Sequence, residues 1–94
     1  SRFAPGRITI IGNMEDLPTN TVIVDGEAYN INYLNTNADA QIKLIEWYNS
    51  GNEVYIKLND DIIVNPQGEL ISEDNLPDRL VYFDQNGDQY FYEK

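Results

Sequence analysis

The segment Asp84-Gln85-Asn86-Gly87-Asp88 places acidic or amide side chains at alternate positions, as a calcium-binding loop does. The pattern then breaks, because the sixth position holds Gln89 where such a loop needs Gly. Asn86-Gly87 between two aromatic segments is also typical of a hairpin turn, since both residues tolerate positive φ. We therefore predict a structural turn here, with no metal and no cofactor.

Three pairs of adjacent carboxylates are the next candidates for chemistry: Glu15-Asp16, Asp60-Asp61 and Glu73-Asp74. Two carboxylates in one pocket can hydrolyse a glycoside or hold Mg²⁺. Neighbouring residues on a strand point to opposite faces, which is poor geometry for a shared site. We therefore predict solvated charge at strand edges and loops. Asp60, Asp61, Glu73 and Asp74 become candidates for contact with a protein partner.

The chain has no His and no Cys, the side chains that most often act as general base, thiol nucleophile or soft-metal ligand. The hydroxyls of Ser1, Ser50 and Ser72 would need a lysine as their base. Lys43 and Lys57 fall in amphipathic segments, where we expect solvated ammonium groups. The sequence therefore predicts a protein that is not an enzyme. A hydrolase that uses carboxylates alone is the remaining catalytic alternative.

Sixteen Asp and Glu against six Lys and Arg give a formal net charge of -10 at pH 7. Phosphate backbones and anionic membranes repel such a chain, so we expect no direct nucleic-acid or membrane binding. A basic protein is the electrostatically favoured partner. No apolar run approaches the roughly 20 residues that span a bilayer, which predicts a soluble, non-spanning protein whose compartment stays open.

The acidity also supports an alternative function. Side chains on one face of a strand lie about 6.5–7 Å apart, close to the spacing of successive phosphates along a nucleic-acid strand. A sheet edge with carboxylates at this spacing can imitate a nucleic acid. In size and charge the chain resembles small acidic phage proteins that block DNA-binding enzymes. That resemblance implies an inhibitor that occupies the basic groove of a DNA- or RNA-acting enzyme.

Two turn motifs position the first predicted hairpins. Asp25-Gly26 suits a two-residue turn in which Val24 pairs with Glu27 and Val22 with Tyr29, and the strand after it is expected to reach Tyr33. Its Val22 side then faces the core and its other side faces water. Asn65-Pro66-Gln67-Gly68 fits a type I turn between residues 61–64 and 69–72.

Asn86-Gly87 defines a third predicted hairpin, in which Phe83 opposes Tyr90 and Tyr82 opposes Phe91. Both faces of this hairpin are aromatic. It is therefore either covered on both sides or offers one face to a partner. We take Tyr82 and Phe91 as candidates for partner contact.

One helix is predicted over residues 37–49, with Asn37 or the preceding Thr36 as its N-cap and Gly51 as its left-handed stop. Its apolar positions follow the 3.6-residue period and are expected to face the core: Ala38, Ile42, Leu44, Ile45 and Tyr48. Trp47 lies off the Ile42–Ile45–Tyr48 line, either part-exposed or over a sheet edge. It is a further candidate for partner contact.

Together these elements predict an α+β fold: a strongly bent, mostly antiparallel sheet of hairpins, open or partly closed into a barrel, with one amphipathic helix. Residues 1–6 are predicted to be an irregular lead-in. Residues 7–94 are predicted to form a single domain that opens with a short strand over 7–12. Because the sequence begins with Ser1 rather than Met, we expect a processed chain or part of a longer protein.

The absent catalytic groups and the doubly aromatic hairpin favour a non-enzymatic protein-binding or assembly module. The predicted setting is a larger microbial or viral structural protein, in which the partner is a basic or sibling structural protein. Homo-oligomers are compatible with the same features. The acidic inhibitor described above is the alternative.

Overall fold

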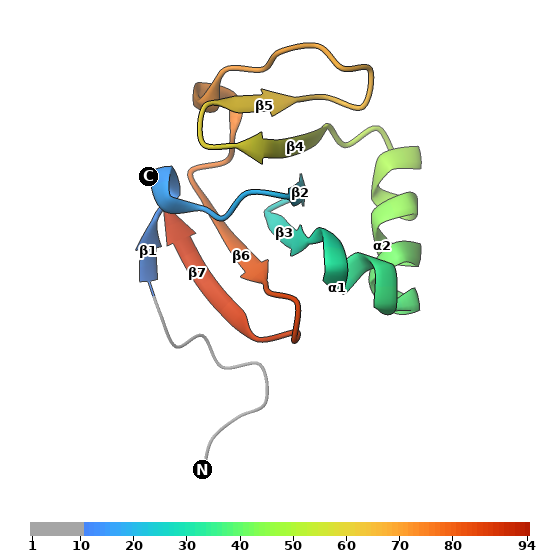
Figure 1. Ribbon diagram of the computed structural model, residues 1–94. Helices are drawn as coiled ribbons and strands as arrows, with labels where there is room; N and C mark the ends of the chain where they lie inside the picture. Colours follow the sequence, from blue (N-terminus) through green and yellow to red (C-terminus); the bar gives the residue numbers. More distant parts are fainter. Residues whose placement is uncertain (1–10) are drawn as a thin grey trace.

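The computed structural model describes residues 11–94. Within this range seven strands form one curled sheet, and two α-helices pack beside it (Figure 1). The predicted lead-in over 1–6 and most of the predicted strand over 7–12 lie outside the described residues. The elements are β1 (Ile11–Asn13), β2 (Thr21–Val24), β3 (Glu27–Asn30), α1 (Ile31–Thr36), α2 (Ala38–Asn49), β4 (Val54–Asn59), β5 (Ile62–Val64), β6 (Arg79–Phe83) and β7 (Gln89–Glu93). Two short 3₁₀ helices, η1 (Met14–Asp16) and η2 (Glu73–Asn75), lie in the connections.

The strands form one mixed sheet in the order β1-β7-β6-β3-β2-β4-β5. The β1–β7 and β3–β6 pairs are parallel, and the other neighbours are antiparallel. The fold is therefore α+β with a half-barrel sheet, in rough agreement with the mostly antiparallel sheet expected. The expectation of a single helix is wrong. Residues 31–33 were expected to continue the strand after Asp25-Gly26, but the Asn30 side chain accepts a hydrogen bond from the Asn32 amide and starts α1 there.

The turn between β2 and β3 has the geometry that Asp-Gly favours, with φ of 52° at Asp25 and 79° at Gly26. Val24 lies opposite Glu27 and Val22 opposite Tyr29, the register expected from the turn. The expected water-exposed side does not exist, because all four residues of β2 are buried. A strand buried on both faces lies between two cores.

The first core lies on the sheet face away from the helices and consists of Met14, Leu17, Ile23, Ala28, Ile63, Leu76, Leu80 and Tyr82. The second core lies between the sheet and the helices and consists of Val22, Val24, Tyr29, Leu34, Ala40 and Val54. Met14, Leu17 and Leu76 come from segments around η1 and η2, for which no local pattern predicted a place in a core. They cover the face that was expected to be wet.

The β6–β7 register is shifted by one residue from the one predicted: Tyr82 lies opposite Tyr90 and Phe83 opposite Gln89. The cause is the Asp84 carboxylate, which accepts hydrogen bonds from the amides of Asn86 and Asp88, both at 2.9 Å. This bonding makes a wider loop than a two-residue turn, with Gly87 at a φ of 84°. The turn at Asn65 also forms, but residues 69–72 add only an isolated bridge between Val64 and Leu70.

Helix α2 has the predicted ends. The Asn37 side chain accepts from the Ala40 amide at 2.9 Å, and Gly51 has a φ of 91° just beyond the C-terminus. Of the apolar residues predicted to face the core, Leu44 does so, whereas Ala38 and the other three are exposed. Ala40, Leu44 and Trp47 pack on the second core, whereas Ile42, Ile45 and Tyr48 are 55%, 57% and 47% exposed. Both lines fit the helical period, and the line with the small Ala40 lets the helix approach the sheet closely.

Candidate functional site

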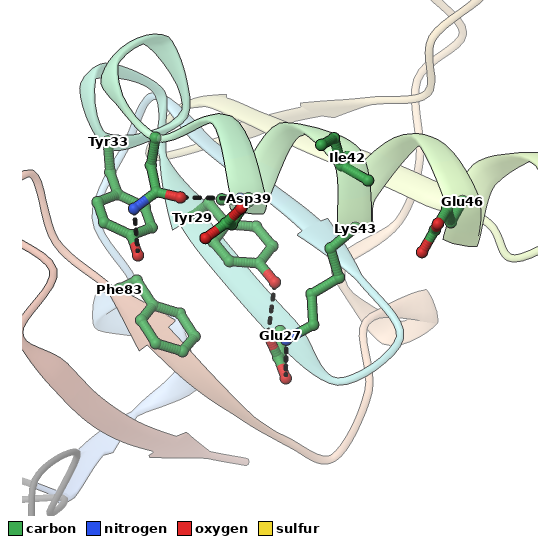
Figure 2. Close-up of a pocket in the computed structure, with 10 residues that line it drawn as sticks. Glu27, Tyr29, Tyr33, Asp39, Ile42, Lys43, Glu46 and Phe83 are labelled. Carbon is green, nitrogen blue, oxygen red and sulfur yellow. Dashed lines mark hydrogen bonds and ion pairs between the residues drawn. The ribbon is translucent and has the colours of Figure 1, made fainter.

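A cleft of about 340 Å³ opens between α2 and the neighbouring strands β3 and β6 (Figure 2). It is lined by Glu27, Tyr29, Tyr33, Asn37, Asp39, Ala40, Ile42, Lys43, Glu46 and Phe83. The asparagine cap that starts α2 also fixes one wall, because Asn37 donates to the Tyr33 hydroxyl at 3.2 Å. The cleft is therefore set by regular elements and a helix cap rather than by a loop.

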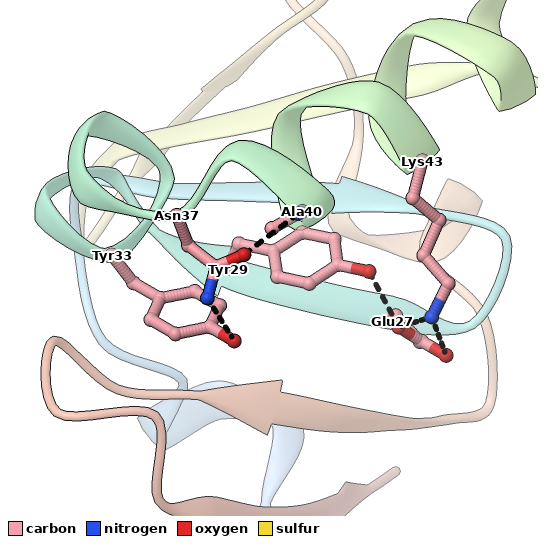
Figure 3. A network of polar contacts seen from close by, with 6 residues as sticks. All are labelled: Glu27, Tyr29, Tyr33, Asn37, Ala40 and Lys43. Carbon is pink, nitrogen blue, oxygen red and sulfur yellow. Dashed lines mark hydrogen bonds and ion pairs between the residues drawn. The ribbon is translucent and has the colours of Figure 1, made fainter.

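Figure 3 shows two separate sets of polar contacts at the cleft, and the set formed by Tyr29, Glu27 and Lys43 joins β3 to α2. The buried Tyr29 donates its hydroxyl proton to Glu27 Oε1 at 2.5 Å, and Lys43 Nζ lies 3.2 Å from the same oxygen. Burial raises the pKa of Tyr29 well above its usual range, and the hydrogen bond to Glu27 adds to the rise. The hydroxyl therefore stays protonated and orients the carboxylate as a fixed donor.

Three aromatic rings form one wall of the cleft. The ring centroids of Tyr29, Tyr33 and Phe83 are 5.3–6.3 Å apart, and the ring planes lie within 17° of one another. Three nearly parallel rings at mutual distances this similar cannot form a single column. They lie side by side with offsets, as Figure 2 shows. Tyr29 is buried, so the half-buried rings of Tyr33 and Phe83 are the part of this wall that can meet a flat or cationic group.

The charges of the cleft are unbalanced. Its lining carries three carboxylates, those of Glu27, Asp39 and Glu46, and one ammonium group, that of Lys43. Asp39 and Glu46 are exposed and lie within about one helical turn of Lys43. With the aromatic wall, this excess of negative charge makes the cleft suited to a cationic guest.

The exposed apolar line of α2 borders the cleft. Ile42 contributes to the cleft lining, and Ile45 and Tyr48 continue the line toward the C-terminus of the helix. Tyr48 reaches a second hollow of about 180 Å³ beside Tyr55 and Pro66. Helix α2 therefore has three sides: a packed side, an acidic side with Lys43 that faces the cleft, and an exposed apolar side. We call Ile42, Ile45 and Tyr48 the outer stripe.

The aromatic residues predicted to meet a partner are placed differently from one another. Tyr82 is only 4% exposed and belongs to the first core, so the prediction that it faces a partner is not met. Trp47 is half-buried against the second core, with Lys43 Nζ at 5.1 Å from its ring centroid. Phe91 is half-buried on β7 opposite Val81.

The predicted acidic contacts are exposed but lie away from the cleft. Asp60 and Asp61 lie at the β4–β5 turn, and Glu73 and Asp74 lie in η2. None of the four lines the cleft or the second hollow. Among residues 11–94, no group of three or more acidic side chains is placed to hold a metal ion.

Lys57 was expected to be solvated, and that expectation is wrong. Lys57 is only 2% exposed, and its side chain lies on the face of β4 that packs on the first core. Its Nζ donates hydrogen bonds to the carbonyl oxygens of Leu17 at 2.6 Å and Glu15 at 3.4 Å. A cation at the C-terminal end of η1 satisfies carbonyls that the short helix leaves unpaired. Lys57 is therefore a structural residue that ties η1 to the sheet.

Sequence reasoning missed the polar part of the cleft. The Asp25-Gly26 turn, through the strand register that it sets, predicted that Tyr29 and Tyr33 share one face of the strand after it. No local signal relates Glu27 to Lys43, which lies sixteen residues further along and meets it only through packing. Neither helix in the described part of the chain is long and apolar enough for a bilayer crossing.

Comparisons of the sequence with protein-family models, curated proteins and solved structures found no match. The assignment of a function therefore depends on the cleft and the outer stripe.

Proposed function

We propose that this domain is a non-enzymatic protein-binding module that recognises its partner through the outer stripe of α2. The observation that carries the proposal is the exposure of Ile42, Ile45 and Tyr48 on a helix whose other apolar side is already packed. Isolated exposed apolar residues are common, but a continuous line beside a cleft is typical of a recognition surface.

The gain from covering the stripe is appreciable. Full burial of a large apolar side chain is worth about 1.5–3 kcal/mol, so burying the exposed half of each stripe residue contributes roughly 1 kcal/mol. A partner that also fills the cleft gains further contacts. These contributions suit a module of moderate affinity that forms and releases complexes.

The test selects peptides from a displayed library on immobilised domain and compares Ile45→Asp with Leu70→Asp as a matched control. Leu70 is 77% exposed and lies beside β5, outside the cleft lining. We expect selected peptides to bind the wild type and Leu70→Asp alike and to lose about tenfold or more on Ile45→Asp. Both variants should keep their stability within about 1 kcal/mol.

Peptides that ignore Ile45→Asp would overturn the proposal, as would a selection that enriches none. The acidic-inhibitor alternative predicts a different result. Its ligands would be strongly basic, would lose affinity steeply as salt rises, and would bind Ile45→Asp as well as the wild type.

A further inference from the structure

We infer that the partner inserts an arginine into the cleft beside α2, where its guanidinium replaces Lys43 at Glu27 while neighbouring apolar residues cover the outer stripe. This inference rests on the proposed function and identifies the chemistry of the partner. The partner is a basic amphipathic segment of another protein.

The charges in the cleft favour such a guest. Three carboxylates face a single ammonium, so a second cation brings the lining closer to neutrality. Glu27 is the most enclosed of the three carboxylates, and Tyr29 already fixes one of its oxygens. A guanidinium that reaches Glu27 therefore meets an oriented acceptor rather than a mobile side chain.

Lys43 is held loosely enough to be displaced. Its side chain is about half exposed, and exposed ion pairs of this kind add little to stability. Asp39 and Glu46 lie four and three residues away on the same helix as alternative partners. Its ammonium also lies 5.1 Å from the centroid of the Trp47 ring, a contact that does not depend on Glu27. Lys43 thus behaves as a resident cation that a better-fitting one can replace.

The aromatic wall favours arginine over lysine. The guanidinium group is planar, weakly hydrated and able to stack on ring faces, whereas an ammonium is a compact, strongly hydrated charge. Tyr29 is buried, and the half-buried rings of Tyr33 and Phe83 stack against it and line the cleft with Glu27. These two rings are the ones that a guanidinium can reach. One guest group can therefore use the rings and the carboxylate together.

A second copy of this chain fits the stripe poorly. Each copy has a formal charge of -10, and pairing two outer stripes brings Asp39 and Glu46 of both helices close together. Like charges at an interface disfavour association. Charge complementarity therefore selects a basic partner and disfavours a homodimer through α2.

The experiment uses a synthetic helical peptide with a leucine stripe and one flanking arginine, and the same peptide with glutamine or lysine in place of that arginine. Trp47 is the single tryptophan of the chain and reports binding by fluorescence. We expect the arginine peptide to bind about tenfold more tightly than the glutamine peptide and about threefold more tightly than the lysine peptide. Glu27→Gln should remove most of that preference.

Two further variants separate displacement of Lys43 from general electrostatics. Lys43→Met should raise the affinity for the arginine peptide about three- to tenfold, because the competing cation is gone. Lys94→Met makes the same change in charge at the C-terminus, which Figure 1 shows on the other side of the molecule from α2, and should change the affinity less than about twofold.

Equal affinity for the arginine and glutamine peptides, or equal effects of Lys43→Met and Lys94→Met, would overturn this inference. If Ile45→Asp still weakened peptide binding in that case, the outer stripe would remain the binding surface and only the arginine inference would fall. If Ile45→Asp had no effect, or if no peptide bound, the proposed function and the arginine inference would both be overturned. A concentration-dependent dimer that Ile45→Asp dissolves would overturn the choice of partner.

Discussion

Leu44 and Ile45 are adjacent on α2 and have side chains of the same atomic composition, yet the helical rotation places Leu44 on the packed side and Ile45 on the exposed side. Leu44 packs against the second core, and Ile45 is 57% exposed. Leu44→Ala removes packed atoms and leaves a space, whereas Ile45→Ala removes atoms that largely contact water. The two substitutions therefore test directly which side of α2 faces the sheet.

The expected difference is large. A buried Leu→Ala change costs about 2–5 kcal/mol, and the partly buried Leu44 belongs near the lower end, at about 2 kcal/mol. Ile45→Ala loses limited contact and gains a few tenths of a kcal/mol in helix propensity, so its net effect stays within about 0.5 kcal/mol. With a urea dependence of roughly 1 kcal/mol per M, the midpoint falls by about 2 M for Leu44→Ala and by less than about 0.5 M for Ile45→Ala.

Urea unfolding followed by far-UV circular dichroism measures both midpoints, with equal slopes as the check that the same transition is observed. A larger loss for Ile45→Ala than for Leu44→Ala would mean that the Ile42–Ile45–Tyr48 line faces the core. That result would refute the outer stripe and the proposed function with it.

Two further substitutions test the buried polar groups. Lys57→Met keeps the side-chain stem but leaves the carbonyls of Leu17 and Glu15 without their donor, so the free energy of unfolding should fall by about 1–3 kcal/mol; no fall would contradict the role of Lys57. The pKa of Tyr29 is raised in the folded state, so its contribution is complete below the usual value of 10.0 and is lost as pH rises. Above about pH 10 stability should fall by about 1.4 kcal/mol per pH unit from this group, and Tyr29→Phe should show a correspondingly shallower decline in urea unfolding. Identical slopes for the two proteins would contradict the assignment.

The features that the sequence predicted well depend on a few adjacent residues. Asp25-Gly26 sets a turn through its own backbone preferences, and that turn fixes the register of β2 and β3. Asn37 and Gly51 set the ends of α2 in the same local way. The type and limits of these elements were therefore accessible without knowledge of the rest of the fold.

The features that it missed depend on distant segments or on a side-chain hydrogen bond that overrides a local pattern. Helix α1 required that the Asn30 cap override a strand pattern, and the burial of Lys57 required that η1 fold onto β4. The β6–β7 register depended on one carboxylate, that of Asp84, widening the loop. The polar part of the cleft combines residues of β3, α2 and β6, so neither spacing nor composition revealed it.

Helix α2 could have packed on the sheet through either of two apolar lines, and the line that it leaves exposed is informative about function. Either apolar line satisfies the helical period, and a helix in a small domain buries the line that closes the core most completely. Ala40, Leu44 and Trp47 do so without help from Ile42, Ile45 or Tyr48. Folding therefore gives no reason for three large apolar side chains on the water side, where they raise the tendency to aggregate. A partner that covers them supplies that reason. The acidic residues beside them then limit unwanted association with other apolar surfaces while attracting a basic one.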